Sequence, residues 1–315
     1  MKLLYIVAGL EESNGMANTA RQFAEEERAQ GHESAVTNDL SALDSSVDVV
    51  HLHGAWLPIL WRAAKKARHL GAKLIIRPAG SYDPVRRAYH GWKKQLVSFF
   101  EHRMLLRADV VLATCQAEVE WIRKYEPRVK KIEVTDLKRF FNLNHEIHET
   151  HERGEWGALH LLYLGRRHPL KGVEYLETAV AELNSSTPPL TTPPLLKIVS
   201  NAFGEEKEKV WEWCDVLVLP TLSENFGLVV AEALERGKRV ITTDGAPAWG
   251  EELELPVSSL EVRVSSLEEG LDGQSPSIRT GYGGRLLYLV GYRDGSANER
   301  VRLLKEAILK LVASR

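Results

Sequence analysis

Two glutamates near the start of an expected helix are the first candidates for chemistry. Glu224 and Glu232 lie in the segment TLSENFGLVVAEAL, residues 221–234, directly after an apolar run. On a helix they would stand about 80° apart, so both carboxylates could face one side. N–H groups at a helix start can bind a phosphate, and here they belong to Phe226, Gly227 and Leu228. The alternative is a glutamate near the helix N-terminus followed by an ordinary surface glutamate.

Two cations follow another apolar run. Arg166 and Lys171 stand in the segment GRRHPLKG, residues 165–172. A planar guanidinium and a compact ammonium, separated by a proline-containing turn, suit a diphosphate and could stabilise a leaving group as its negative charge grows. The alternative is a basic loop without a ligand. Neither a Walker A motif nor a dinucleotide-binding Gly-x-Gly-x-x-Gly motif occurs in the sequence.

Both segments follow runs of the kind that form buried parallel strands. Such runs alternate with stretches long enough for amphipathic helices, as in repeated βαβ units. The expected strands are residues 3–8, 48–52, 73–77, 109–114, 159–164, 195–200, 215–219 and 239–243. The expected helices are residues 16–30, 56–70, 86–106, 116–125, 172–184, 205–213, 226–236 and 298–312. With a short strand or hairpin at 283–292, the pattern predicts an α/β protein of two doubly wound halves.

The length of 315 residues suits two domains, each large enough to bury its own core. A polar stretch without helix or strand periodicity predicts a first domain at 1–143, a linker at 144–156 and a second domain at 157–315. Three histidines of the linker raise the question of a metal site: His145, His148 and His151. Their spacing of three differs from that of a helical zinc-protease pair and favours a solvated linker.

The charge of the chain is nearly balanced, with 41 Lys+Arg against 43 Asp+Glu, but one segment is strongly basic. Residues 61–107 carry 12 basic side chains and two acidic ones. Within it, residues 86–103 mix cations with aromatics, as do helices that lie on anionic lipid. The alternative is a helix with buried aromatics and solvated charges. A slightly acidic chain without a recognition motif argues against nucleic acid as a partner.

Cysteine usage and hydropathy bear on location. Only Cys115 and Cys214 occur, and no uninterrupted apolar run reaches the roughly 18 residues that span a bilayer. Two distant thiols form neither a disulfide framework nor a metal-ligand set. These features predict a soluble protein of the reducing cytoplasm.

Taken together, the motifs resemble those of the retaining family 4, or group 1, glycosyltransferases of GT-B fold. The resemblance is carried by the Arg166 and Lys171 segment and by the pair Glu224 and Glu232, each after a strand of the second half. Further matches follow in order along about residues 1–250: GHE at 31–33, DVVHLHG at 48–54, ADVVLAT at 108–114 and RVITTDGAP at 239–247. RPAGSYDP at 77–84, followed by the basic helix, is most similar to enzymes that build lipopolysaccharide cores and other surface polysaccharides.

The resemblance implies two Rossmann-like domains with a donor and acceptor cleft between them. Arg166 and Lys171 would bind the diphosphate of a nucleotide-sugar, Glu224 would bind the donor sugar, and Glu232 would bind the ribose. Glu224, Arg166 and Lys171 would thus carry catalysis. The other donor-side residues would be Asn14, Gly15, Asn225, Phe226, Gly227 and Leu228.

The acceptor, a surface glycan or lipid-linked sugar, would bind mainly on the first domain. Its candidate residues are His53, Arg77, Ser81 and Asp83. The resemblance further implies a hexosyltransferase-like reaction that retains the anomeric configuration and needs neither metal nor cofactor, the nucleotide-sugar being a substrate. With the cysteine usage and the basic segment at 86–103, the prediction is an enzyme of the cytoplasm, with peripheral contact to the anionic inner face of the cell membrane as one of the two alternatives for that segment.

Two other functions stay open at this point. One is a GT-B enzyme acting on a sugar phosphate, such as a phosphorylase or epimerase, and the other is a non-catalytic glycan-binding subunit. Relatives of this kind normally have a further βα unit between the strands at 195–200 and 215–219, and only a short connection and one helix fit here. Because that unit often reads the nucleotide base, the identity of the base is open.

Overall fold

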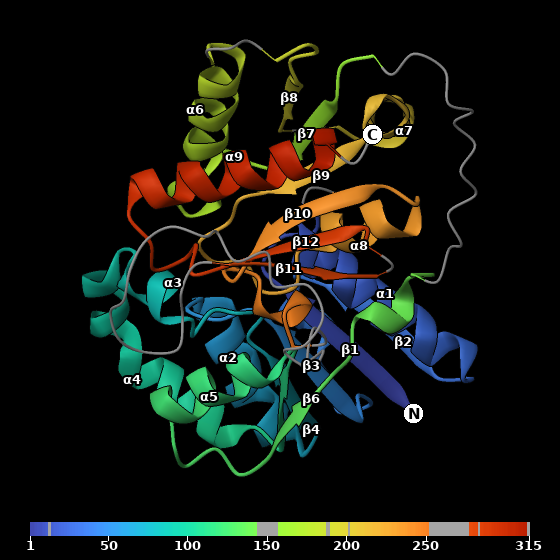
Figure 1. Ribbon diagram of the computed structural model, residues 1–315. Helices are drawn as coiled ribbons and strands as arrows, with labels where there is room; N and C mark the ends of the chain where they lie inside the picture. The colour runs from blue at the N-terminus through green and yellow to red at the C-terminus, as the bar shows by residue number, and fades with distance from the viewer. Residues whose placement is uncertain are drawn as a thin grey trace. The chain divides into compact units, whose positions relative to one another are not determined.

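The computed structural model describes residues 1–11, 14–143, 157–186, 190–200, 202–251, 277–282 and 284–313. The chain forms two compact units, residues 1–140 and 141–315 (Figure 1). The predicted linker 144–156, with its three histidines, lies outside the described residues. Each unit is an α/β structure built on one sheet, as the sequence predicts.

The first unit is built on a six-stranded parallel sheet with the order β2-β1-β3-β4-β5-β6. Its strands are β1 (Lys2–Val7), β2 (Glu33–Thr37), β3 (Val49–His53), β4 (Lys73–Arg77), β5 (Val110–Ala113) and β6 (Ile132–Val134). Its helices are α1 (Gly15–Ala29), α2 (Pro58–Leu70), α3 (Pro84–Ala88), α4 (Gly91–Arg107) and α5 (Gln116–Tyr125). The chain reverses its direction across the sheet at β1, which pairs with β2 on one side and β3 on the other.

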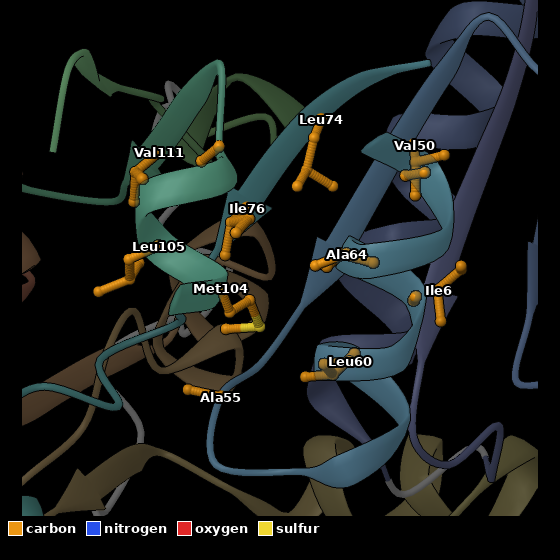
Figure 2. Packing of buried hydrophobic residues seen from close by; sticks show 14 of the residues in the cluster. Ile6, Val50, Ala55, Leu60, Ala64, Leu74, Ile76, Met104, Leu105 and Val111 are labelled. Atoms are coloured by element: carbon orange, nitrogen blue, oxygen red, sulfur yellow. The ribbon is translucent and has the colours of Figure 1, made fainter. Parts of the chain in front are cut away.

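Apolar strand residues and small helix residues form the core of this unit. Figure 2 shows Ala64 of α2 and Leu105 of α4 among strand residues such as Ile6 and Ile76. All five residues of β3 are buried, including its two histidines, which explains why its sequence does not alternate between apolar and charged residues. This packing holds the carboxyl ends of the central strands in register.

The second unit has a sheet with the order β11-β12-β10-β9-β7-β8, in which only β11 is antiparallel to its neighbour. Its strands are β7 (His160–Leu164), β8 (Leu195–Val199), β9 (Val216–Leu219), β10 (Arg239–Thr243), β11 (Ser277–Gly281) and β12 (Leu286–Val290). Its helices are α6 (Val173–Asn184), α7 (Gly204–Trp213), α8 (Leu228–Glu235) and α9 (Ala297–Ala313). Helix α9 packs against α6. The reversal of direction lies at β7, between β8 and β9.

The structure corrects the sequence prediction in three places. The single helix expected at 86–106 is two helices, because His90 adopts a left-handed conformation with φ of 55° between α3 and α4. The strands β2 and β6 were not predicted, because they contain exposed residues and lack a continuous apolar run. Helix α8 begins at Leu228 rather than at Phe226, because Gly227 takes a φ of 70°.

Candidate active site

The two sequence segments with candidate chemistry follow adjacent strands of the second unit. The segment with Arg166 and Lys171 leaves β7, and the segment with Glu224 leaves β9, which pairs with β7 in parallel. After β7 the chain continues to β8, toward one edge of the sheet, and after β9 it continues to β10, toward the other edge. Open α/β sheets bind ligands at the carboxyl ends of such a strand pair, because the loops diverge there and leave a crevice.

Backbone hydrogen bonds join the two loops directly. The carbonyl oxygen of Leu170 accepts from the Leu222 amide at 2.9 Å and from the Thr221 hydroxyl at 3.1 Å. Gly172 ends the first loop with a φ of 61°, and a Cβ there would lie closer than 3.0 Å to the carbonyl oxygen of Pro220. Glycine is therefore required at this position both by its backbone conformation and by the approach of the second loop.

The close approach places Lys171 against Glu224. The Lys171 Nζ and a carboxylate oxygen of Glu224 form an ion pair between residues 53 positions apart in the sequence. The side chains are 20% and 21% exposed, so solvent reaches both but screens the pair less than at an open surface. The other carboxylate oxygen accepts from the Asn225 amide at 3.0 Å. The site thus presents an ammonium group and an oriented carboxylate side by side.

A third loop, after β10, buttresses the Glu224 segment. The Glu224 amide donates to the Gly245 carbonyl at 2.7 Å, and the Thr243 hydroxyl donates to the Thr221 carbonyl. A Cβ at Gly245 would lie closer than 3.0 Å to that same Thr221 oxygen. The Glu224 backbone is therefore held from two sides.

Asp244 extends this support to the loop that follows β12. Its carboxylate accepts from the Gly291 and Arg293 amides, each at 2.7 Å. Burial raises the pKa of Asp244, and the two amide donors oppose that shift. We interpret Asp244 as a structural carboxylate that ties two loops together.

The start of α8 supplies backbone donors beside Glu224. Gly227 occupies the capping position, and no side chain of the described residues caps it. The preceding Phe226 is buried against Trp249, with ring centroids 5.0 Å apart, and Asn225 is also buried. The amides of Phe226, Gly227 and Leu228 thus stand on a segment fixed by packing, as an anion site at a helix start requires.

Glu232 has a cationic partner of its own. Its carboxylate lies 2.7 Å from the Nζ of Lys207, which stands in the first turn of α7. Sequence reasoning missed Lys207, because the run EEKEK at 205–209 has the appearance of a solvated helix face. The two glutamates on which the prediction rests are therefore both in ion pairs, with different lysines.

Arg166 differs from Lys171 in its surroundings. It is exposed, and its guanidinium has no hydrogen bond or ion pair with any residue that the structure describes. Its carbonyl accepts from the Tyr163 hydroxyl at 2.9 Å. The neighbouring Arg167 is paired with Glu177, with a nitrogen to oxygen distance of 3.1 Å. Arg166 could therefore bind a ligand without first breaking an ion pair with a described residue.

In the first unit, His53 and Arg77 end the paired strands β3 and β4 and are register partners. His53 is buried, with its ring centroid 5.7 Å from that of Tyr5 and 5.9 Å from that of Phe23. Neither ring nitrogen has a hydrogen-bond partner among the described residues. Burial lowers the pKa of His53 well below its usual range, so the ring is neutral.

Arg77 is also buried, and burial lowers its pKa to about 10. It donates to the Thr114 hydroxyl at 3.4 Å. Glu118, a second residue that sequence reasoning missed, acts on the same region: its carboxylate accepts from the amides of Gly80 at 2.6 Å and Thr114 at 2.8 Å. Burial raises the pKa of Glu118, and only its position in an ordinary helical segment was visible in the sequence.

The remaining first-unit candidates have local structural partners. The Ser81 hydroxyl donates to the Pro78 carbonyl at 2.6 Å. Buried Asp83 accepts from the Val85 amide at 2.9 Å and so begins α3. Asn14 accepts from the Met16 amide at 3.1 Å and begins α1, of which Gly15 is the first residue. The functional roles of these residues stay predictions.

Comparison with known proteins places this geometry in a family. The family model described as glycosyl transferase 4-like domain matches residues 35–137, and the one described as glycosyl transferases group 1 matches residues 197–254. The chain belongs to the group 1 glycosyltransferases. The second match contains β9, the Glu224 loop and α8, and so covers half of the site described above.

Curated relatives of this chain are D-inositol 3-phosphate glycosyltransferases of Corynebacterium. The protein from Corynebacterium efficiens is 26% identical over 56% of this chain and 48% of its own length. The Corynebacterium glutamicum protein matches with the same identity and the same two shares. The chain thus spans about half the length of the curated relatives that it matches.

Solved structures show the same fold. Sucrose-phosphate synthase from Thermosynechococcus elongatus superposes with a TM-score of 0.59 at 16% identity, covering 81% of this chain and 83% of that one. Anabaena HepE in complex with UDP and glucose superposes with a TM-score of 0.55 at 14% identity, covering 98% and 90%. The predicted GT-B fold is confirmed.

Proposed function

We propose that this protein is a retaining, metal-independent glycosyltransferase that moves a hexose from a nucleotide-sugar donor to a surface glycan or lipid-linked acceptor. The observation that carries the proposal is the Lys171 and Glu224 pair, held where the loops of β7 and β9 meet. Arg166 adds an exposed cation on the same loop. Membership of the group 1 glycosyltransferases supports the reaction class.

The pairing of Lys171 with Glu224 supports a division of labour between them. While no ligand is bound, the ion pair stabilises both groups, because neither charge is unpaired at a partly buried position. When a donor binds, Lys171 and Arg166 would bind its diphosphate, and Glu224 would accept from hydroxyls of the sugar. The N–H groups at the start of α8 would bind the same phosphates.

The reaction would proceed on one face of the donor sugar. The bond between the anomeric carbon and the diphosphate oxygen breaks as the acceptor oxygen forms its bond to that carbon. The acceptor proton passes to the departing phosphate oxygen. Lys171 and Arg166 would stabilise the charge that grows on the leaving group, which is the largest electrostatic contribution this site could make.

Glu232 would bind the ribose, and Lys207 would orient its carboxylate. We take a uridine nucleotide as the first donor to test, since HepE of the same fold was crystallised with UDP. The curated relatives act on an inositol phosphate by their name, and a phosphorylated acceptor fits that precedent. His53, Arg77, Ser81 and Asp83 are our acceptor-side candidates. We place the enzyme in the cytoplasm, at the inner face of the cell membrane.

A nucleotide panel followed by a turnover assay tests this function. We expect UDP, or else GDP, ADP or CMP, to raise the melting temperature, because a ligand that binds only the folded state stabilises it. We then expect the matching nucleotide-sugar to be consumed only with a glycosyl acceptor and to give product of unchanged anomeric configuration, with chelator present. No response to any nucleotide would favour a non-catalytic glycan-binding subunit. Turnover without an acceptor would favour a phosphorylase or epimerase.

A further inference from the structure

The exposed large apolar side chains of the described residues gather on one short segment. Ten such residues are exposed, and five of them stand between Tyr89 and Phe100. On α4, Trp92 is 63% exposed, Leu96 74%, Phe99 61% and Phe100 51%. Single exposed apolar residues are normal, whereas a cluster of this kind indicates a contact surface.

These four residues share one face of α4, opposite the face that packs on the unit. At 100° per residue they fall within an arc of about 100°, centred roughly opposite Glu101. The inner face is already built from Glu101, Met104 and Leu105, which are buried. Of the four, Phe100 also stacks on Trp61 of α2, with ring centroids 5.3 Å apart. Trp92, Leu96 and Phe99 are each more than 60% exposed, and packing of this unit does not account for their apolar character.

The charges around this face are cationic. From Pro84 to Arg107 the only acidic residue is Glu101, and it faces inward. Its carboxylate accepts from the Trp56 amide at 3.0 Å, the Trp61 indole at 2.6 Å and the Tyr82 hydroxyl at 2.5 Å. Six Lys or Arg residues lie in the same stretch: Arg86, Arg87, Lys93, Lys94, Arg103 and Arg107.

Two of these cations stand next to the exposed rings. The Lys93 Nζ lies 5.5 Å from the centroid of the Trp92 ring, and the Arg103 guanidinium carbon lies 5.2 Å from that of Phe99. Lysine and arginine can extend to a lipid headgroup while their stems follow an apolar surface. Tryptophan prefers the same interfacial depth, where its apolar body and polar N–H are both accommodated.

We propose that α4 is a membrane-docking helix that lies in the headgroup region of an anionic bilayer, with Trp92, Leu96, Phe99 and Phe100 toward the acyl chains. An anionic bilayer matches both the apolar arc and the cations around it. A second copy of the chain would bring two cationic surfaces together and is disfavoured. None of the helices in the described ranges is long and apolar enough to cross a membrane. In the proposed contact, α4 therefore lies on the membrane surface. The inference rests on the proposed function only for the acceptor that docking would bring within reach.

Vesicle sedimentation tests the docking without any need for sugar transfer. We expect the full chain to sediment with vesicles of equal parts phosphatidylcholine and phosphatidylglycerol, and to bind pure phosphatidylcholine much more weakly. Trp92→Ser, Leu96→Ser and Phe99→Ser combined should weaken binding at least about tenfold. Lys93→Ser with Arg103→Ser should weaken it by about fivefold per cation, and added salt should act in the same direction.

A matched control uses exposed apolar residues elsewhere. Leu195 on β8 and Leu309 on α9 are 48% and 37% exposed, and Leu195→Ser with Leu309→Ser should leave vesicle binding unchanged. Melting curves of all variants show whether each is folded, and the nucleotide-induced shift of the triple variant should equal that of the original protein. That shift separates the two proposals, because it reports the donor site and not docking.

Three outcomes would overturn the docking helix. The first is equal binding of the original protein and the triple variant to anionic vesicles. The second is no vesicle binding by a protein that still responds to a nucleotide. The third is a concentration-dependent dimer in sedimentation velocity that the triple variant abolishes, which would assign this face to a second copy of the chain.

Discussion

The carboxyl edges of the two sheets each carry a cation and a glutamate, but these residues differ in exposure and in their partners. In the first unit, Arg77 and Glu118 are buried, and the carboxylate bonds to loop amides. In the second unit, Lys171 and Glu224 pair with each other while solvent still reaches them. The first arrangement holds loops in place, whereas the second leaves charge that a ligand can bind. Exposure and choice of partner, rather than residue type, therefore separate a structural edge from a reactive one.

The largest expected effect comes from removing the cation of the reactive edge. Lys171→Ala should lower kcat/KM for transfer about 10²- to 10³-fold, because the leaving diphosphate would lose an oriented charge. Steady-state kinetics with the nucleotide-sugar identified by the panel measures this. Arg167→Ala is the matched control, since Arg167 stands on the same loop but pairs with Glu177. Equal losses in both variants would mean that the loop, rather than the Lys171 site, is what matters.

The approach of the two loops can be broken sterically. Gly172→Ala should lower the free energy of unfolding by about 2–4 kcal/mol, because the new Cβ would meet the Pro220 carbonyl and the backbone has a positive φ. Denaturant unfolding measures the change. Gly237→Ala separates the two causes, since Gly237 has a φ of 68° and no described atom lies within 4 Å of its Cβ position. It should cost about 1 kcal/mol. A Gly172→Ala protein as stable as the Gly237→Ala protein would contradict the described packing of the loops.

A substitution at the carboxyl edge of the first sheet is expected to lower stability without affecting nucleotide binding. Glu118→Gln should lower the free energy of unfolding by about 1–3 kcal/mol, because an amide can accept only one of the two N–H bonds at full strength. Thermal melts measure this loss. The shift induced by the nucleotide should be unchanged, since Glu118 belongs to the first unit. A normal melting temperature with a lost nucleotide response would reverse the assignment of the two edges.

The smallest expected effect is on the pH dependence of the stability of the first unit, and it comes from Glu126, which belongs to neither of the two compared sites. Arg128, with the backbone and His102 assisting, lowers the pKa of Glu126 to about 2. Because the folded-state pKa is lowered, the stabilisation is complete above the unfolded value of 4.5 and is lost as pH falls toward 2. Melting curves of the original protein and Glu126→Gln should therefore differ most near neutral pH and converge in acid. A gap that stays constant down to pH 3 would contradict the role of this ion pair.

Local pattern was sufficient for most strands. All eight predicted strands are present, and the seven that are mostly buried carry adjacent apolar residues, as a strand covered on both faces requires. The eighth, β8, has an apolar sequence although none of its residues is buried. The edge strands β2 and β6 lack that signal. The break at His90 escaped prediction, and the sequence left open whether the aromatics of α4 face inward or outward. An apolar residue has the same identity whether it packs inward, like Met104, or lies exposed, like Leu96.

The sequence by itself determined the α/β class, the resemblance to group 1 glycosyltransferases, and the two segments that carry Arg166, Lys171, Glu224 and Glu232. Only the tertiary structure decided which charges meet: Lys171 with Glu224, and Lys207 with Glu232. The reason is that periodicity reports how each segment is buried, while contacts between distant segments depend on strand order. That order placed β7 beside β9 and so brought together two loops that are far apart in the chain.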